Sequence, residues 1–320
     1  MPASFTEYLF LAPSLALSLL VVVPLSGVLV RFRANYTPRG LALDNEGGPV
    51  VHTGPVVTSY FGMFRRVWQI EGLQGLYKGL MPTFLTALTV SLAILSFMDT
   101  PSHRHVSYRA PSAGLLGTFL YSILMMLISL PSAILTCNAV TTPHKLPYFG
   151  LMKSLRVLLT PTERRRPWVI YLTPGLLASQ CLHVAYVTLI LAPLHRLLVP
   201  MSESGMFPEL SPVKLSIYLA VVIVSAAILT PLEVVSTRLA IQRNQASPEY
   251  NSVSQEVEGD AEEVAEYAGA EEDVIGLRTE AEPYTGLIDC AKTIVNEEGF
   301  RALYRAWWVT LLGGTVSALA

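Results

Sequence analysis

The chain has 320 residues, of which 52% are hydrophobic and only 14% are charged. This composition, with a mean hydropathy of +0.46, is typical of a membrane protein and argues against the two soluble domains that the length alone would allow. The formal net charge is −2, but twelve of the 24 acidic residues lie within residues 249–282, so the remainder of the chain is basic.

Six stretches of the chain contain no Asp, Glu, Lys or Arg and predict membrane-spanning helices. A helix needs roughly 20 apolar residues, and about 17 as a lower limit, to cross the hydrocarbon core. The sixth stretch is short, and Arg305 extends it if its long side chain reaches back to the interface. The stretches are residues 8–30, 79–98, 110–144, 167–195, 215–232 and 306–320.

The connections between these stretches alternate in length. Long loops follow the first, third and fifth stretches, and short links follow the second and fourth, so the helices group into three pairs. The predicted units are residues 1–105, 106–205 and 206–320. The long loops of the first two pairs are rich in Arg and Lys, which places them on the more negative side of the membrane.

The first helix of each pair carries a proline-centred motif. Residues 231–238 read Pro-Leu-Glu-Val-Val-Ser-Thr-Arg, Pro24 and Arg31 repeat the seven-residue spacing, and Pro131 begins a third copy that lacks charges. Proline kinks a membrane helix, and charges at that depth need a partner or a wet cavity. Three such motifs about 100 residues apart predict a threefold repeat.

A second phrase recurs in the long loops: Glu-Gly, then Leu-Tyr, a basic residue and a small residue. It occupies residues 71–79 and 298–306, whereas residues 164–167 interrupt it in the middle unit. The phrase predicts a short surface helix that ends at glycine and leads into the next span.

The third unit contains an acidic insert at residues 245–282. Its high net charge and few large apolar side chains predict disorder, because such a segment cannot bury enough surface to offset its ordering entropy. Such a segment can be a solvated linker or, alternatively, a tail that binds a protein partner.

These motifs together resemble the mitochondrial carrier family, over nearly the whole chain, strongly in units one and three and weakly in unit two. The resemblance implies an all-α membrane protein, with six transmembrane helices in three pseudo-repeated pairs and short matrix-side helices. It also implies a central cavity, cytosolic termini, long loops in the matrix if the inner membrane is the site, and transport by alternating access.

The family's gating charges are mostly missing here. The resemblance assigns gate roles to Glu233, to Arg31 and Arg238 seven residues after a proline, and to Asp99 on the cytosolic side. The matrix gate needs acids two residues after each proline and bases five after, and only Glu233 remains charged among Ser26, Ala133, Glu233, Leu29, Thr136 and Ser236. A weak gate is therefore expected.

The family's substrate contact points fall, by offset, on uncharged residues: Thr86, Gln180 with Cys181, and Gly313. His183 is three residues beyond Gln180 and shares its helical face; a histidine inside a membrane is a functional candidate. An anion in a low-dielectric cavity needs a countercharge, so the solute expected here is small and neutral or zwitterionic. Ordinary packing residues are the alternative interpretation.

Tyr77, Lys78 and Gly79 match the family's phrase for binding the membrane lipid cardiolipin. A helix N-terminus presents free N–H groups to a phosphate, and lysine adds charge. Aromatic residues are common at membrane interfaces in any case.

No pattern indicates catalysis, a cofactor, a metal or a nucleic-acid partner. The three cysteines, Cys137, Cys181 and Cys290, are widely spaced and odd in number, which gives neither a disulfide framework nor a zinc site.

Two functions follow from the resemblance. The first is a mitochondrial solute carrier, with the inner membrane favoured over the outer. The alternative is a carrier-fold protein of the outer membrane that no longer transports and acts as an adaptor in mitochondrial fusion, lipid handling or organisation. The missing gate charges favour this alternative.

Overall fold

The computed structural model of the protein is almost entirely helical. It describes residues 5–39, 42–43, 49–50, 55–97, 114–144, 146, 151–198, 212–242, 273–278 and 283–319. The only strands in these ranges are β1 (Ala42–Leu43) and β2 (Pro49–Val50), which pair antiparallel.

Four of the predicted spans are confirmed as helices long and apolar enough to cross a membrane. They are α1 (Phe5–Ala34), α5 (Gly114–Thr141), α10 (Pro212–Ile241), and α8 (Leu176–Tyr186) continued through the π-helical turn η2 (Val187–Leu191) into α9 (Ala192–Leu198). Helices α4 (Leu80–Phe97) and α13 (Trp307–Leu319) coincide with the other two predicted stretches and are shorter. Large apolar side chains lie exposed along these helices, Leu120 and Val224 among them, as expected for surfaces that face lipid.

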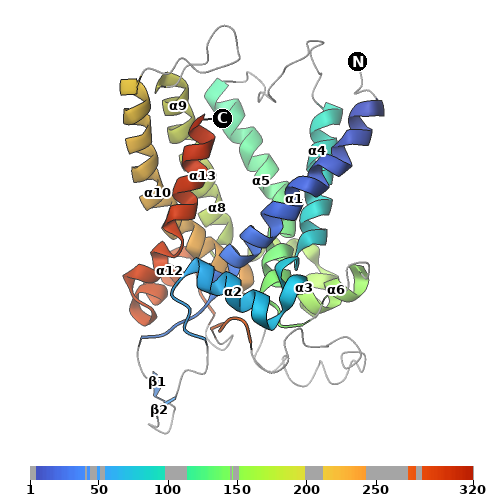
Figure 1. Cartoon of the computed structure of the whole chain (residues 1–320), viewed down its shortest axis with the longest axis vertical. Helices are drawn as coiled ribbons and strands as arrows, with labels where there is room; N and C mark the ends of the chain where they lie inside the picture. Colours follow the sequence, from blue (N-terminus) through green and yellow to red (C-terminus); the bar gives the residue numbers. More distant parts are fainter. Residues whose placement is uncertain are drawn as a thin grey trace.

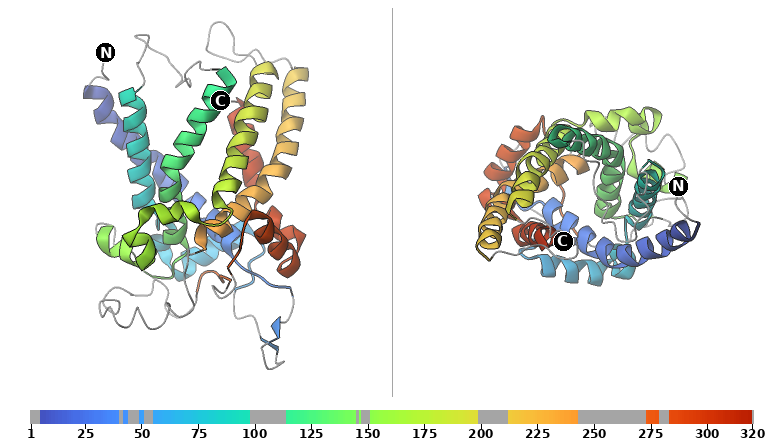
Figure 2. Two further views of the ribbon diagram at one scale, coloured as in Figure 1. Left: turned by 180° about the vertical axis from the view of Figure 1, so that it is seen from behind. Right: turned by 90° about the horizontal axis from the view of Figure 1, so that it is seen from above.

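The long helices follow one another around the molecule in chain order (Figure 2). Contacts join α1 to α4, α4 to α5, α5 to α8, α8 to α10 and α10 to α13. The helices diverge towards the end that carries both termini and approach one another at the opposite end (Figure 1). We call that opposite end the short-helix face.

The short-helix face is built from short elements. It carries α2 (Tyr60–Ile70), α3 (Gly72–Leu76), α6 (Leu151–Leu158) and α12 (Leu287–Glu297). The shorter α7 (Pro161–Arg165), η1 (Pro167–Leu172) and η4 (Phe300–Tyr304) complete the connections. As predicted, α2 and α12 end at the Glu-Gly phrases, where Gly72 and Gly299 adopt φ of +64° and +88°, a conformation that favours glycine.

The three proline-bearing helices meet near this face. Pro24, Pro131 and Pro231 each lie inside a helix, and α1, α5 and α10 contact one another pairwise. Between α5 and α10 the contact is apolar, with Leu130 and Ile134 in one core with Val234 and Val235. Polar contacts also join α1 to α5, through Arg31 and the Val140 carbonyl, and to α10, through Arg33 and Glu233; they lead to the candidate site.

Residues 273–278 differ from the disorder predicted for the acidic insert. Val274 and Ile275 are buried in a core with Val28, Met63 and Val67. Apolar burial of this kind favours an ordered segment, and it comes from the Val-Ile pair that breaks the acidic run. After residue 278, the next residues that the structure describes start at 283.

Candidate functional site

A small group of polar side chains lies between the long helices. Arg33 of α1 donates from Nη2 to Oε2 of Glu233 on α10 at 2.6 Å. Thr310 of α13 completes this Arg33–Glu233 cluster: its hydroxyl donates to Glu233 Oε2 at 2.7 Å and accepts from Arg33 Nη2 at 3.0 Å. The side chains of Arg33 and Glu233 are 8% and 24% exposed, so the ion pair is largely withdrawn from solvent.

A fourth helix contributes His183. Located on α8, it lies close enough to interact electrostatically with both Glu233 and Arg33. The Nε atom of Arg33 is buried without a hydrogen-bond partner among the described residues. A buried donor in this state costs free energy, so the cluster has an unmet capacity to bind an acceptor.

Arg31 points away from this cluster into a separate ion-pair group. Its guanidinium donates to Glu71 Oε2 at 2.5 Å, to the Gly75 carbonyl at 3.0 Å and to the Val140 carbonyl at 2.9 Å. Lys78 donates to the other oxygen of Glu71 at 2.5 Å. We call Arg31, Glu71 and Lys78 the first triad; it joins α1 to α3 and to the C-terminal end of α5.

The first triad is buried. The side chains of Arg31 and Glu71 are 1% and 3% exposed. Burial lowers the pKa of Lys78, and the neighbouring Glu71 carboxylate opposes that shift. Each charged side chain of the first triad therefore needs its partners to remain buried, because an unpaired buried charge strongly destabilises the fold.

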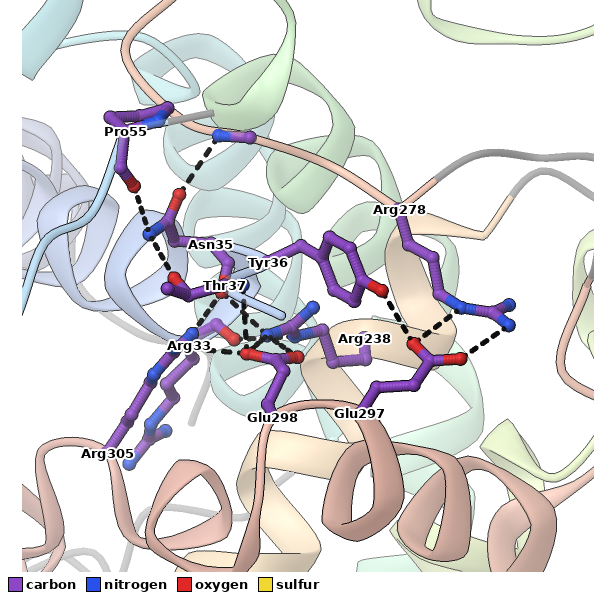
Figure 3. A network of polar contacts seen from close by, with 11 residues as sticks. Arg33, Asn35, Tyr36, Thr37, Pro55, Arg238, Arg278, Glu297, Glu298 and Arg305 are labelled. Carbon is purple, nitrogen blue, oxygen red and sulfur yellow. Dashed lines mark hydrogen bonds and ion pairs between the residues drawn. The ribbon is translucent and has the colours of Figure 1, made fainter. Parts of the chain in front are cut away.

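Arg238 forms an equivalent group at the end of α10 (Figure 3). Its Nη2 donates to both oxygens of Glu298, at 2.8 and 3.1 Å, and Arg305 pairs with the same carboxylate at 3.0 Å. Arg238 also donates to the carbonyls of Arg33 and Asn35, each at 2.7 Å. Arg238, Glu298 and Arg305 are the second triad, and they fasten α10 to the end of α1.

The two triads use the same sequence positions. In each, the base seven residues after a proline and the base of the Leu-Tyr-basic phrase share the glutamate of the Glu-Gly phrase. On α5 the corresponding position is Asn138, which has no charge for such a pair. Glu163 of the middle unit instead caps α7 together with Thr160.

The predicted gate residues therefore separate. Glu233 lies in the Arg33–Glu233 cluster, whereas Arg31 and Arg238 belong to the triads; Asp99 lies outside the described residues. Leu29, five residues after Pro24, has no charge. Arg33, nine residues after Pro24, is the base that pairs with Glu233.

Of the predicted substrate contacts, His183 alone has a described interaction with the cluster. The Thr86 hydroxyl donates to the Pro82 carbonyl at 2.7 Å and contacts the Ser132 hydroxyl of α5. Gln180 and Cys181 are half-buried on α8. Gly313 is exposed on α13, one turn beyond Thr310, with open space where a Cβ would lie.

The predicted lipid-binding residues make contacts within the protein. The Tyr77 hydroxyl donates to the Leu20 carbonyl at 3.1 Å, and Lys78 is held by Glu71. Gly79 has φ of +85°, and a Cβ there would lie 3.1 Å from Thr136 of α5. Lipid binding by these residues stays a prediction.

Four residues of these polar groups were not predicted from the sequence: Arg33, Glu71, Glu298 and Thr310. For the two glutamates a signal existed, because each stands at the same place in a repeated phrase that also holds its two partners. Arg33 had no such signal: it is two residues beyond Arg31, and only the packing of α1 against α10 brings it to Glu233.

Comparison with known proteins identifies one family. Its model, described as mitochondrial carrier protein, matches residues 8–106 and 214–320. These are the two parts of the chain that contain the triads. A search of curated proteins found no match.

Proposed function

Because the chain belongs to the mitochondrial carrier family, we propose that it moves a small neutral or zwitterionic solute across a mitochondrial membrane by alternating access. The family and the four apolar helices make it a multi-pass mitochondrial membrane protein of the carrier type. In the proposal α4 and α13 also span the membrane, giving six spans in three repeats. The short-helix face is placed on the matrix side of the inner membrane.

The observation that carries this proposal is the Arg33–Glu233 cluster with His183 beside it. Four helices, α1, α8, α10 and α13, bring polar groups together between apolar spans. Polar groups at membrane depth mark solute and ion pathways, because their desolvation is costly without a function or a partner.

The charges of the cluster favour a solute without net charge. A solute carboxylate can accept from the unpartnered Arg33 Nε, and a solute ammonium can donate to Glu233. One base and one acid balance each other, so a solute with several negative charges would lack countercharge in the interior. In the proposal Thr86, Gln180, Cys181 and Gly313 contact the uncharged part of the solute.

The same ion pair serves as the gate of the proposed cycle. It ties α1 to α10 close to the short-helix face, and a solute that binds either partner weakens the tie. Arg31 holds α1 to α3 and α5 through the first triad, whereas the contacts of Arg238 with the end of α1 loosen together with the gate.

Reconstituted protein tests the proposal. We expect proteoliposomes to take up at least one labelled solute from a panel of amino acids and small neutral metabolites. Arg33→Gln leaves Glu233 without its charged partner, and a hydrogen bond to a charged group contributes roughly 1.5–3 kcal/mol, so the uptake rate falls at least about tenfold. Arg301→Gln removes an exposed arginine of η4 and is the matched control, with uptake unchanged.

Flat uptake across the whole panel would reject transport. In that case the outer-membrane adaptor becomes the better account, and protease added to intact mitochondria distinguishes the two locations. Cleavage within the acidic loop while the inner membrane stays closed would place that loop outside and contradict the matrix placement.

A further inference from the structure

Residues 273–278 form a bridge across the short-helix face. They follow the acidic part of the third unit, yet they pack against the end of α1, against α2 and against α12. Two of the six residues, Val274 and Ile275, are buried among side chains of α1 and α2. We call this stretch the clasp segment.

One half of the clasp segment is bound to the first unit. Arg66 of α2 donates to the carbonyls of Asp273 and Val274, at 3.0 and 3.1 Å. The Gly276 N–H donates to Asn35 Oδ1 at 2.9 Å, and the Gly276 carbonyl accepts from the Tyr36 N–H at 2.7 Å. Backbone groups of the clasp segment are thus held by hydrogen bonds from α2 and by the chain just after α1.

The other half is bound to the third unit through Arg278 (Figure 3). Its guanidinium donates to both oxygens of Glu297 on α12, at 3.0 and 3.1 Å, and lies 5.0 Å from the ring centroid of Tyr284. Tyr36 donates its hydroxyl to the same carboxylate at 2.9 Å. The Glu297 carboxylate therefore accepts two hydrogen bonds from the clasp segment and one from the chain just after α1.

The clasp segment is linked to the Arg33–Glu233 cluster through Asn35. The Asn35 side chain accepts from Gly276, its main-chain carbonyl accepts from Arg238, and Arg33 lies two residues earlier in the same chain. Movement of the end of α1 away from α10 and α12 must stretch these contacts together.

Among the ties across this face, the Arg278–Glu297 pair is the most accessible to solvent. Its side chains are 15% and 30% exposed, against 5% and 1% for Arg238 and Glu298. Partly exposed pairs contribute less than buried ones and are screened by salt. This pair can therefore break and re-form while the triads stay intact.

We propose that the clasp segment is a built-in lock of the short-helix face, which joins the first unit to the third and must release Arg278 from Glu297 before that face opens. The inference rests on the proposed alternating access for its role, but the lock itself is a property of the protein without solute. It gives the insert of the third unit a regulatory use: whatever displaces Arg278 favours opening.

Spin-label distances across the face test the lock. Labels at Gln69→Cys on α2 and Asn296→Cys on α12, both exposed positions, are placed in full-length protein whose three native cysteines are alanine, in nanodiscs. Arg278→Gln should raise the fraction of the longer-distance population about threefold. Arg278→Lys keeps the charge but loses the contact with both carboxylate oxygens, so it should fall between the parent and Arg278→Gln. Arg301→Gln should leave the distribution near that of the parent.

The salt dependence of the distance distribution distinguishes a lock from a segment that only stabilises the fold. Raising the ionic strength from about 0.05 M to about 1 M should widen the parent's distribution and have no effect on Arg278→Gln, where the pair is already absent. If the cysteine-free protein does not fold, hydrogen exchange of the native chain measures the same event at the amides of Tyr36 and Gly276.

A distribution that is the same in Arg278→Gln as in Arg301→Gln, at both salt concentrations, would overturn the lock. Because no solute is needed, the result is independent of transport: widening without solute uptake supports the lock and counts against the carrier. Solute uptake with unchanged distances supports the carrier and rejects the lock.

Discussion

Glu71 and Glu298 each hold two basic side chains, and this sharing explains how a membrane protein keeps Arg31, Lys78 and Arg238 buried. One carboxylate between two cations leaves a net positive charge in each triad, which main-chain carbonyls of Gly75, Val140 and Asn35 offset by accepting hydrogen bonds. Buried ion pairs of this type add little relative to apolar packing, but removing one partner is strongly destabilising.

The variant Glu71→Gln tests this dependence. It leaves Arg31 and Lys78 buried without a counterion, so we expect a loss of roughly 3–5 kcal/mol and a fall of about 10 °C in the melting temperature measured in detergent. Lys292→Gln, at an exposed position of α12, should melt with the parent. Equal melting temperatures for the two variants would contradict the dependence.

At the residue scale, a charge inside or beside an apolar run predicts that the side chain needs a partner, but it does not identify that partner. The acid of Glu233 and the bases of Arg31 and Arg238 were identified as charges that need partners. Their actual partners depend on tertiary contacts between residues 40 to 200 positions apart, which spacing along one helix does not contain. Arg33 was not singled out because it is only two residues from Arg31, although the two side chains have different partners.

At the scale of elements, glycines decide how closely the short helices approach the long ones. Gly175, at the start of α8, has φ of +78°, and a Cβ there would lie 2.3 Å from the Leu287 nitrogen of α12. This is a contact between two backbones, which neither partner can relieve by turning a side chain. The middle unit is therefore joined to the third by backbone contact.

Gly175→Ala should consequently prevent this approach. The left-handed backbone alone costs on the order of 1 kcal/mol for alanine, and the clash adds to it. We expect a smaller monodisperse fraction in size-exclusion chromatography and a lower melting temperature. Gly313→Ala is the matched control: open space surrounds that position, and alanine favours the helix. Normal yield of Gly175→Ala would show that α8 and α12 do not need this contact.

Most elements were predictable because they follow from composition and local signals. Uncharged runs located the long helices, and the Glu-Gly phrases located the ends of α2 and α12. The ordered clasp segment was not predicted, because averaging over the acidic insert hid the two adjacent apolar residues, Val274 and Ile275. Their burial depends on apolar side chains of α1 and α2, which lie far away in the sequence.

On the scale of the whole molecule, polar ties close one end of the helix assembly and connect mainly its first and third units. The Arg33–Glu233 cluster, the second triad and the clasp segment all join α1 or the chain after it to α10, α12 or α13. The middle unit supplies acceptors, such as the carbonyls of Val140 and Thr142, and apolar packing. An opening movement is thus expected between the first and third units.

The charge exchange of Arg33 and Glu233 tests the central claim most directly. In the proteoliposome uptake assay, Arg33→Glu and Glu233→Arg each place like charges together, and we expect each to fall at least about tenfold below the parent. The double variant restores an opposite pair between α1 and α10 and should recover most of the uptake. A double variant no better than either single one, or a parent that takes up no solute, would contradict the claim that this ion pair gates transport.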